Sequence, residues 1–120
     1  MAEVKKDLQD KAYEAIELAK KSGKLKKGSN EATKSIEKGY AKLVVAANDV
    51  NPREVIMHLE PLCREKDVPF VLVGSKSDLG AAAGLPVSTA AVAIIKEGDS
   101  ANLIKDIKVR LSKDGTKEAK

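Results

Sequence analysis

The sequence predicts an α/β fold, a single-domain three-layer α/β/α sandwich with a small mixed sheet. Short continuous apolar runs, typical of strands covered on both faces, occur at 43–47, 68–73 and 90–95. Segments with apolar residues at helical spacing alternate with these runs. At 120 residues the chain has room for one core, so residues 1–120 are expected to form one domain.

The first half of the chain should contain two helices and one buried strand. A helix over about 3–21, ended by Ser22-Gly23, is predicted from the apolar series Val4, Leu8, Ala12 and Ile16. Residues 24–27 suit either a short strand or an extended connector. Gly28-Ser29 opens a second helix over about 30–39. The strand at 43–47 then leads into a turn at 48–52.

The second half continues the alternation. Pro52 lies near the start of a helix that reaches Lys66, with a kink or a restart expected at Pro61. After the strand at 68–73, residues 74–78 lead into a short helix ending at Gly84 and a loop over 85–89. The strand at 90–95 precedes a last helix, capped by Asp99 or Ser100, and the tail from about 112 is polar.

The composition of the chain excludes several classes of protein. Aromatic residues make up 2% of the chain, namely Tyr13, Tyr40 and Phe70, so the core must be aliphatic and an aromatic RNA-stacking sheet is not expected. The sequence has no apolar run of membrane-spanning length, and its charged first residues lack a secretory signal. Cys63 is the single cysteine and cannot form an internal disulfide. The expected location is the cytoplasm.

Positive charge is concentrated in one stretch. The formal net charge is +4, but residues 20–42 hold eight lysines against Glu31 and Glu37, which gives +6 there and −2 elsewhere. A local basic field on a near-neutral body suits a polyanionic partner that docks at one place. A solvated lysine face explains the cluster equally well, so charge alone leaves both interpretations open.

The most informative polar pattern is Gly28-Ser29-Asn30-Glu31 followed by Lys34. Asn30 and Glu31 fall in the first turn of the predicted helix, where backbone N–H groups are free and the dipole is positive. Lys34 lies one turn further on, so an amide, a carboxylate and an ammonium can together read a base edge. Capping by Asn30, with Glu31 as a first-turn acid, explains the same spacing and is favoured by spacing alone.

Other motifs point to weaker alternatives. The turn 74–77 (Gly-Ser-Lys-Ser) follows a buried strand and could hold an anion, which would suit a small nucleotide- or phosphate-binding protein; a plain turn explains it as well. The chain lacks the Walker and dinucleotide glycine patterns, and the glycines at 80 and 84 indicate close helix packing. His58, Cys63 and scattered serines give no nucleophile–base set. We therefore expect a structural histidine, an inert cysteine, no enzyme and no cofactor or metal.

The tripeptide Leu85-Pro86-Val87 is apolar although it lies in a predicted loop. It either tucks into the core or offers an apolar surface to an extruded base. The sequence alone does not separate these two interpretations.

Five ordered blocks together resemble the kink-turn RNA-binding family of archaeal ribosomal protein L-seven-Ae. Ribosomal protein L-thirty-e and the spliceosomal fifteen-kilodalton protein are related to this family. The resemblance covers about residues 10–112, and its most specific block is 26–39, which contains Lys27-Gly28-Ser29-Asn30-Glu31-Ala32-Thr33-Lys34. The supporting blocks are 46–52, 59–63 together with 68–71, 75–84 and 91–94.

The resemblance implies an α/β/α sandwich that binds a kink-turn, a duplex bent at a bulge beside tandem sheared G·A pairs. It implies that Asn30, Glu31 and Lys34 contact those pairs. It also implies that Lys27, Lys38 and Lys76 contact the RNA backbone, and that Gly28 allows the protein backbone to approach the RNA closely.

Further implications concern the loop and the partners. Leu85, Pro86 and Val87 match the family loop that packs on the flipped-out base, although many archaeal members carry Glu in place of Pro86. The resemblance also implies a role in the large ribosomal subunit, in box C/D and H/ACA guide RNA particles and in ribonuclease P. Other proteins of the guide RNA particles would be partners, and a monomer suffices when the protein is free.

Overall fold

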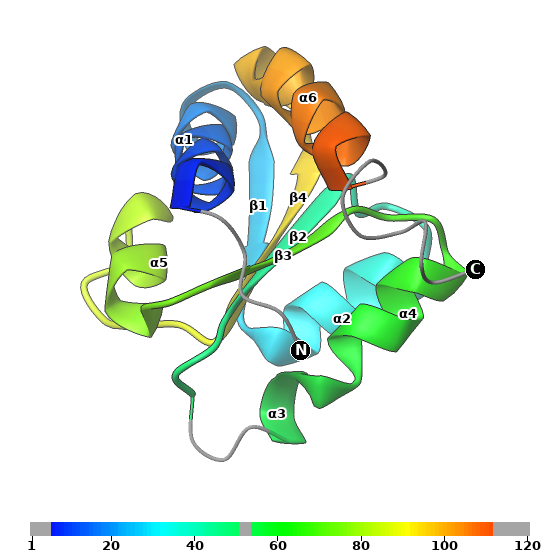
Figure 1. The fold of residues 1–120 in the computed structure, drawn as a ribbon. Coiled ribbons are helices and arrows are strands. Elements are labelled where there is room, and N and C mark those ends of the chain that lie inside the picture. The colour runs from blue at the N-terminus through cyan, green and yellow to red at the C-terminus, as the bar shows by residue number, and fades with distance from the viewer. Residues whose placement is uncertain (1–5, 51–53, 112–120) are drawn as a thin grey trace.

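A four-stranded sheet lies between two helical layers in the computed structural model, which describes residues 6–50 and 54–111. One layer consists of α1 (Lys6–Ser22), α5 (Lys76–Ala82) and α6 (Ala101–Leu111), which follows the short 3₁₀ turn η1 (Gly98–Ser100) (Figure 1). The other layer consists of α2 (Ser29–Glu37), α3 (Glu54–Met57) and α4 (Leu59–Glu65). The predicted α/β/α sandwich is confirmed. Three predicted features lie outside the described residues. They are the start of the first helix at residue 3, the position of Pro52 near a helix start, and the polar tail from about 112.

The sheet is mixed, as predicted, with the spatial order β1-β4-β2-β3. Its strands are β1 (Lys24–Lys27), β2 (Leu43–Ala47), β3 (Phe70–Val73) and β4 (Ala91–Lys96). β2 pairs in parallel with β3, whereas β4 runs antiparallel to both β1 and β2. Residues 24–27, which suited a strand or a connector, therefore form an edge strand.

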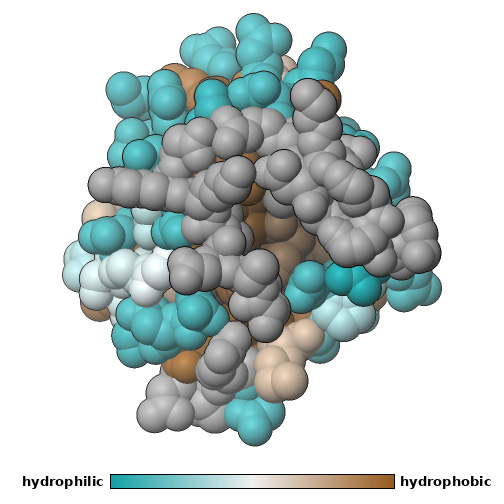
Figure 2. Space-filling view, viewed as in Figure 1, coloured by the Kyte–Doolittle hydropathy of each residue, from teal (hydrophilic) through white to brown (hydrophobic). Residues whose placement is uncertain are grey.

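The core is aliphatic and lies on both faces of the two central strands. All five residues of β2 are buried, as are the first four of β4. Large side chains that pack against them include Ile16 of α1, Ile36 of α2 and Leu79 of α5. Hydrophilic side chains cover the outer helix surfaces, while apolar atoms show toward the middle of the view (Figure 2). Burial on both faces explains why these strands are continuous apolar runs.

The interruption expected at Pro61 occurs three residues before it. α3 ends at Met57 and α4 begins at Leu59, with His58 between them. A proline inside a helix cannot bond the carbonyl four residues back and clashes with it, and that carbonyl here belongs to Met57. Pro61 thus occupies the first turn of α4, where a missing N–H costs little.

Two predicted details are wrong. The strand predicted to begin at Val68 begins at Phe70, because Asp67 adopts a positive φ of 61° and Val68 N–H bonds the Cys63 carbonyl, which ends α4 in a Schellman-type turn. The last helix is not capped by the side chain of Asp99 or Ser100. Instead Asp99 N–H donates to the Ser22 hydroxyl at 2.8 Å, and the Ser100 hydroxyl donates to the Glu97 carbonyl.

Cys63 should be unreactive in the folded protein. It is buried on α4, and burial, with a smaller contribution from Glu60, raises the pKa of its thiol to about 12. Thiolate is the reactive form. We expect a thiol reagent at about pH 8 to label the protein rapidly in denaturant and very slowly without it. Equal labelling rates in the two conditions would contradict the buried thiol.

Candidate functional site

Three strands end and one begins at the same end of the sheet, which we call the site end. Gly28 N–H, directly after β1, donates to the Ala91 carbonyl at 2.7 Å. Asn48 N–H, directly after β2, donates to the Val73 carbonyl at the end of β3. The start of α2, residues 48–50 after β2, the start of α5 and the loop before β4 therefore meet at the lower end of the sheet in Figure 1.

Gly28 determines where α2 begins. It is the N-cap residue, with φ 101° and ψ 152°, and its carbonyl accepts the Ala32 N–H at 2.9 Å. This conformation is essentially restricted to glycine, although no atom within 4 Å would obstruct a Cβ. The helix begins at Ser29, which puts Asn30 and Glu31 in its first turn. The interpretation of Asn30 as the capping residue is therefore wrong, whereas Glu31 is a first-turn acid as expected.

The outer face of α2 carries the predicted polar residues. Ala32, Ser35 and Ile36 are buried on its inner face. Glu37 is exposed, and so are the four predicted residues. Lys34 lies three or four residues from each of the other three, so these four share one side of the helix: Asn30, Glu31, Lys34 and Lys38. Among the described residues, none of these four side chains forms a hydrogen bond or an ion pair. An amide, a carboxylate and an ammonium thus remain available to a ligand.

A hydrogen bond from His58 holds the outer side of α2. The Thr33 hydroxyl donates to the Ser29 carbonyl at 2.7 Å, so it must accept from His58 Nε2, which lies 2.6 Å away. His58 joins α3 to α4, and α2 also packs against α4. The expectation of a structural histidine is confirmed. The sequence did not reveal its partner, because a Thr–His pair 25 residues apart leaves no local pattern.

The start of α5 is already occupied by protein oxygens. Gly74 N–H donates to the Gln9 side chain at 3.1 Å, Lys76 N–H to Asp49 Oδ1 at 2.9 Å, and Asp78 N–H to the Ser75 hydroxyl at 3.1 Å. An anion at this turn would have to displace the Asp49 carboxylate. This disfavours the alternative interpretation of 74–77 as a phosphate site.

The same turn lies in an acidic environment. Burial and then the nearby Asp78 carboxylate raise the pKa of Tyr13, and Asp49 and Asp10 act in the same direction. The same carboxylates disfavour a phosphate held by the backbone N–H groups of this turn, as the alternative interpretation requires. The Lys76 ammonium, half-buried at this position, has no ion-pair partner within 6–50 and 54–111.

The loop over 85–89 combines the two predicted roles, packing into the core and offering an apolar surface. Leu85 is partly buried against the core, and its N–H donates to the Gly80 carbonyl at 2.9 Å. Pro86 and Val87 are exposed, with 66% of Val87 accessible. Thr89 N–H donates to the Lys76 carbonyl, which fixes the loop beside Lys76. One residue therefore tucks inward, and two offer an apolar surface at the site end.

The fold separates the lysines that the sequence groups together. Lys27 and Lys34 lie at the site end and along α2, whereas Lys24 lies at the other end of β1. There Lys24 is paired across the strands with Lys96. Lys42 precedes β2 and also belongs to this far end of the sheet. The single basic patch suggested by the sequence is thus two basic regions.

The part of the chain that the structure describes contains neither a membrane-spanning helix nor a cluster of metal-binding side chains. No helix there is long and apolar enough to span a membrane. No group of three or more histidine, cysteine, aspartate or glutamate side chains there is placed to hold a metal ion.

The fold and the site define an α/β/α domain with a polar, basic helix start at one end of a mixed sheet. The family model of the Ribosomal protein L7Ae/L30e/S12e/Gadd45 family matches residues 10–104, and the chain belongs to this family. Among solved structures, the chain is similar to the Giardia lamblia 15.5kD RNA binding protein. The two share 30% sequence identity over 93% of each chain, with a TM-score of 0.87.

Gly80 should be required for the position of the loop over 85–89. A Cβ at this position would lie 2.2 Å from the Val87 carbonyl oxygen, so the loop would have to move. We expect Gly80→Ala to lower the free energy of unfolding by about 1–3 kcal/mol in a urea titration. Ala81→Ser changes an exposed neighbour on the same helix and should cost less than about 0.5 kcal/mol. Equal losses in both variants would contradict this packing.

Proposed function

We propose that this protein binds RNA at the site end and recognises kink-turns there. The observation that carries the proposal is the set Asn30, Glu31 and Lys34 on the first turns of α2, whose side chains are exposed and unpaired among residues 6–50 and 54–111. Membership of a ribosomal protein family and similarity to a protein described as RNA binding support RNA as the ligand. The adjacent exposed Pro86 and Val87 supply an apolar surface at the same end of the sheet.

The carboxylate is the informative member of this set. Glu31 repels phosphate, so a purely electrostatic RNA site would gain nothing from it. A sheared G·A pair leaves the Watson–Crick edge of guanine free, and its N–H donors suit a carboxylate acceptor. Lys34, one turn along α2, can donate to the guanine O6. Asn30 completes a group that reads base edges.

The remaining predicted residues have supporting roles in the proposal. Lys27, Lys38 and Lys76 bind the phosphate backbone, which contributes affinity without sequence information. Gly28 has no side chain, so the RNA can approach the backbone before α2 closely. Pro86 and Val87 pack on the flipped-out base, with Leu85 anchoring the loop beneath them.

The proposed cellular role follows the family resemblance. The protein would act in the cytoplasm as a large-subunit ribosomal protein and as a core component of box C/D and H/ACA guide RNA particles and ribonuclease P. It would be a monomer when free and would meet the other proteins of the guide RNA particles on the folded RNA. The alternative, a nucleotide-binding protein using 74–77, predicts thermal stabilisation by mononucleotides and none by kink-turn RNA.

The experiment that tests the proposal compares two RNAs. One contains a kink-turn, and the other has the same sequence except that Watson–Crick pairs replace the G·A pairs. The protein should bind the first RNA much more tightly. Equal affinity for both would overturn the proposal.

Glu31 should contribute specificity. We expect Glu31→Ala to weaken kink-turn binding by about 1–3 kcal/mol, since one good polar base contact is lost, while leaving binding to the Watson–Crick control RNA unchanged. Glu37→Ala removes an exposed carboxylate from the other end of α2 and serves as the matched control. Isothermal titration against both RNAs measures the effect. Equal changes for the two RNAs would exclude base reading by Glu31.

Lys27 and Lys76 should contribute affinity. Each phosphate contact releases counterions, so each of Lys27→Ala and Lys76→Ala should reduce the slope of log affinity against log salt by about 1. Discrimination between the two RNAs should persist. Lys21→Ala, on α1, is the control and should leave the slope unchanged. A variant that loses discrimination with an unaltered slope would contradict a backbone role.

A further inference from the structure

A basic groove lies at the far end of the sheet, opposite the site end. It has a volume of about 430 Å³ and lies between α6, the α2–β2 loop and the α4–β3 loop. Four lysines line it together with two carboxylates: Lys42, Lys66, Lys105 and Lys108 against Asp67 and Glu97. The groove is therefore positively charged on balance.

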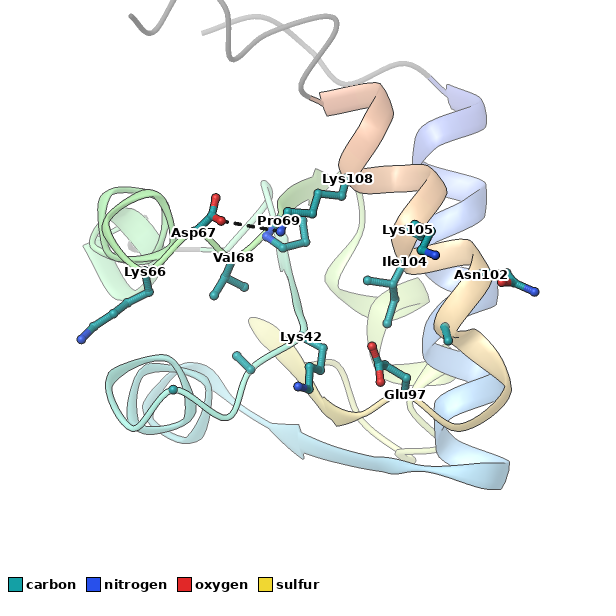
Figure 3. A pocket seen from close by; sticks show the side chains of 13 residues that line it. Lys42, Lys66, Asp67, Val68, Pro69, Glu97, Asn102, Ile104, Lys105 and Lys108 are labelled. Atoms are coloured by element: carbon teal, nitrogen blue, oxygen red, sulfur yellow. Dashed lines mark ion pairs between the residues drawn. The ribbon is translucent and has the colours of Figure 1, made fainter.

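The groove has apolar residues between two sides that are formed by α6 and by the end of α4. Val68, Pro69 and Ile104 contribute apolar surface between the lysines. Figure 3 shows α6 on one side and the end of α4 on the other, with Lys108 reaching across toward Asp67. That ion pair is long, at 3.7 Å, and both side chains are more than half exposed. Such a pair contributes little to stability, so Lys108 can exchange Asp67 for a phosphate at small cost.

An exposed tyrosine lies in the chain between two residues that line this groove. Tyr40 follows Gly39 and precedes Ala41, both of which line the groove, and 59% of Tyr40 is accessible to solvent. The two other aromatic residues of the chain are partly buried against the core. Lys38 and Lys42 lie on either side of Tyr40 in the sequence. Lysines with an interleaved aromatic ring form the combination that holds single-stranded nucleic acid, because bases stack on the ring while phosphates meet the lysines.

α2 leads from the proposed RNA site to the groove, because Gly39, which lines the groove, directly follows the C-cap residue Lys38. α2 begins at the site end and has nine residues, so it spans about 14 Å. Lys34 and Lys38 lie along its exposed face, and Lys38 is its C-cap. A strand that leaves the site end along this face would next meet Tyr40 and Lys42.

We propose that the groove and Tyr40 bind single-stranded RNA that flanks the structured RNA at the site end. This inference rests on the proposed function, because the strand is delivered by the RNA bound at α2. Tyr40 stacks on one base, and Lys42, Lys105 and Lys108 bind phosphates in the groove. An acidic peptide would match the lysines, but it would leave the exposed ring without a planar partner.

The experiment uses the full chain and four RNAs. These are a minimal kink-turn, the same RNA with a single-stranded uridine extension of roughly eight nucleotides at the 5′ or the 3′ end, and the uridine strand alone. The protein should bind one extended RNA roughly five- to tenfold more tightly than the minimal RNA. Tyr40→Phe should keep this gain. Tyr40→Ala and the double variant Lys42→Ala/Lys105→Ala should lose most of it and keep their affinity for the minimal RNA.

A control variant removes the same charge elsewhere. Lys20 and Lys21 are exposed on α1 and do not line the groove, so Lys20→Ala/Lys21→Ala should retain the gain. The groove proposal is overturned if neither extension adds affinity, or if the control variant loses as much as the groove variant. It is also overturned if a polyglutamate peptide, but no RNA extension, binds in a Tyr40-dependent manner.

Failure of the proposed function gives a different result. The minimal kink-turn would then bind no better than its Watson–Crick control, and Glu31→Ala would change nothing. The uridine strand alone still tests the groove in that case. Its weak binding should be reduced by Tyr40→Ala and kept by Tyr40→Phe, and a lack of any effect of Tyr40→Ala would overturn the groove proposal.

Discussion

The bond from Gly28 N–H to the Ala91 carbonyl fixes the geometry of the whole site end. The bond holds Gly28, the one residue between β1 and α2, against Ala91, the first residue of β4. The positive φ of Gly28 lets α2 begin directly after this residue. A longer or looser connection would separate the first turn of α2 from the loop over 85–89. The polar residues of α2 and the apolar residues of that loop lie at the same end of the sheet because of this constraint.

The polar groups at the site end fall into two sets with different uses. Asp49, Gln9 and Ser75 bond backbone N–H groups, and their role is to hold the loops in place. Asn30, Glu31 and Lys34 are exposed on α2 and unpaired among the described residues. The first set is already engaged in hydrogen bonds within the protein, whereas exposed, unbonded groups on a rigid helix can wait for a ligand without cost. This difference separates the scaffold from the recognition surface.

The division of the lysines between the two ends of the sheet changes how the basic stretch functions. A strand four residues long separates Lys24 from Lys27, and a helix of nine residues separates the site end from Lys38. Charges this far apart act nearly independently at physiological ionic strength. A single RNA could therefore contact both regions, with base reading at one end and phosphate binding at the other.

The sequence by itself determined the layers, the aliphatic core, the break near Pro61 and the family, because periodicity and motif spacing are local. It also placed Asn30, Glu31 and Lys34 on one helix face. It could not distinguish a cap from a free side chain at Asn30, since this depends on the backbone of Gly28. Only the tertiary structure decided that Asp49 occupies the start of α5, that Leu85 turns inward while Val87 stays exposed, and that the residues on either side of Tyr40 line a basic groove. These contacts join residues distant in the chain, and no local pattern encodes them.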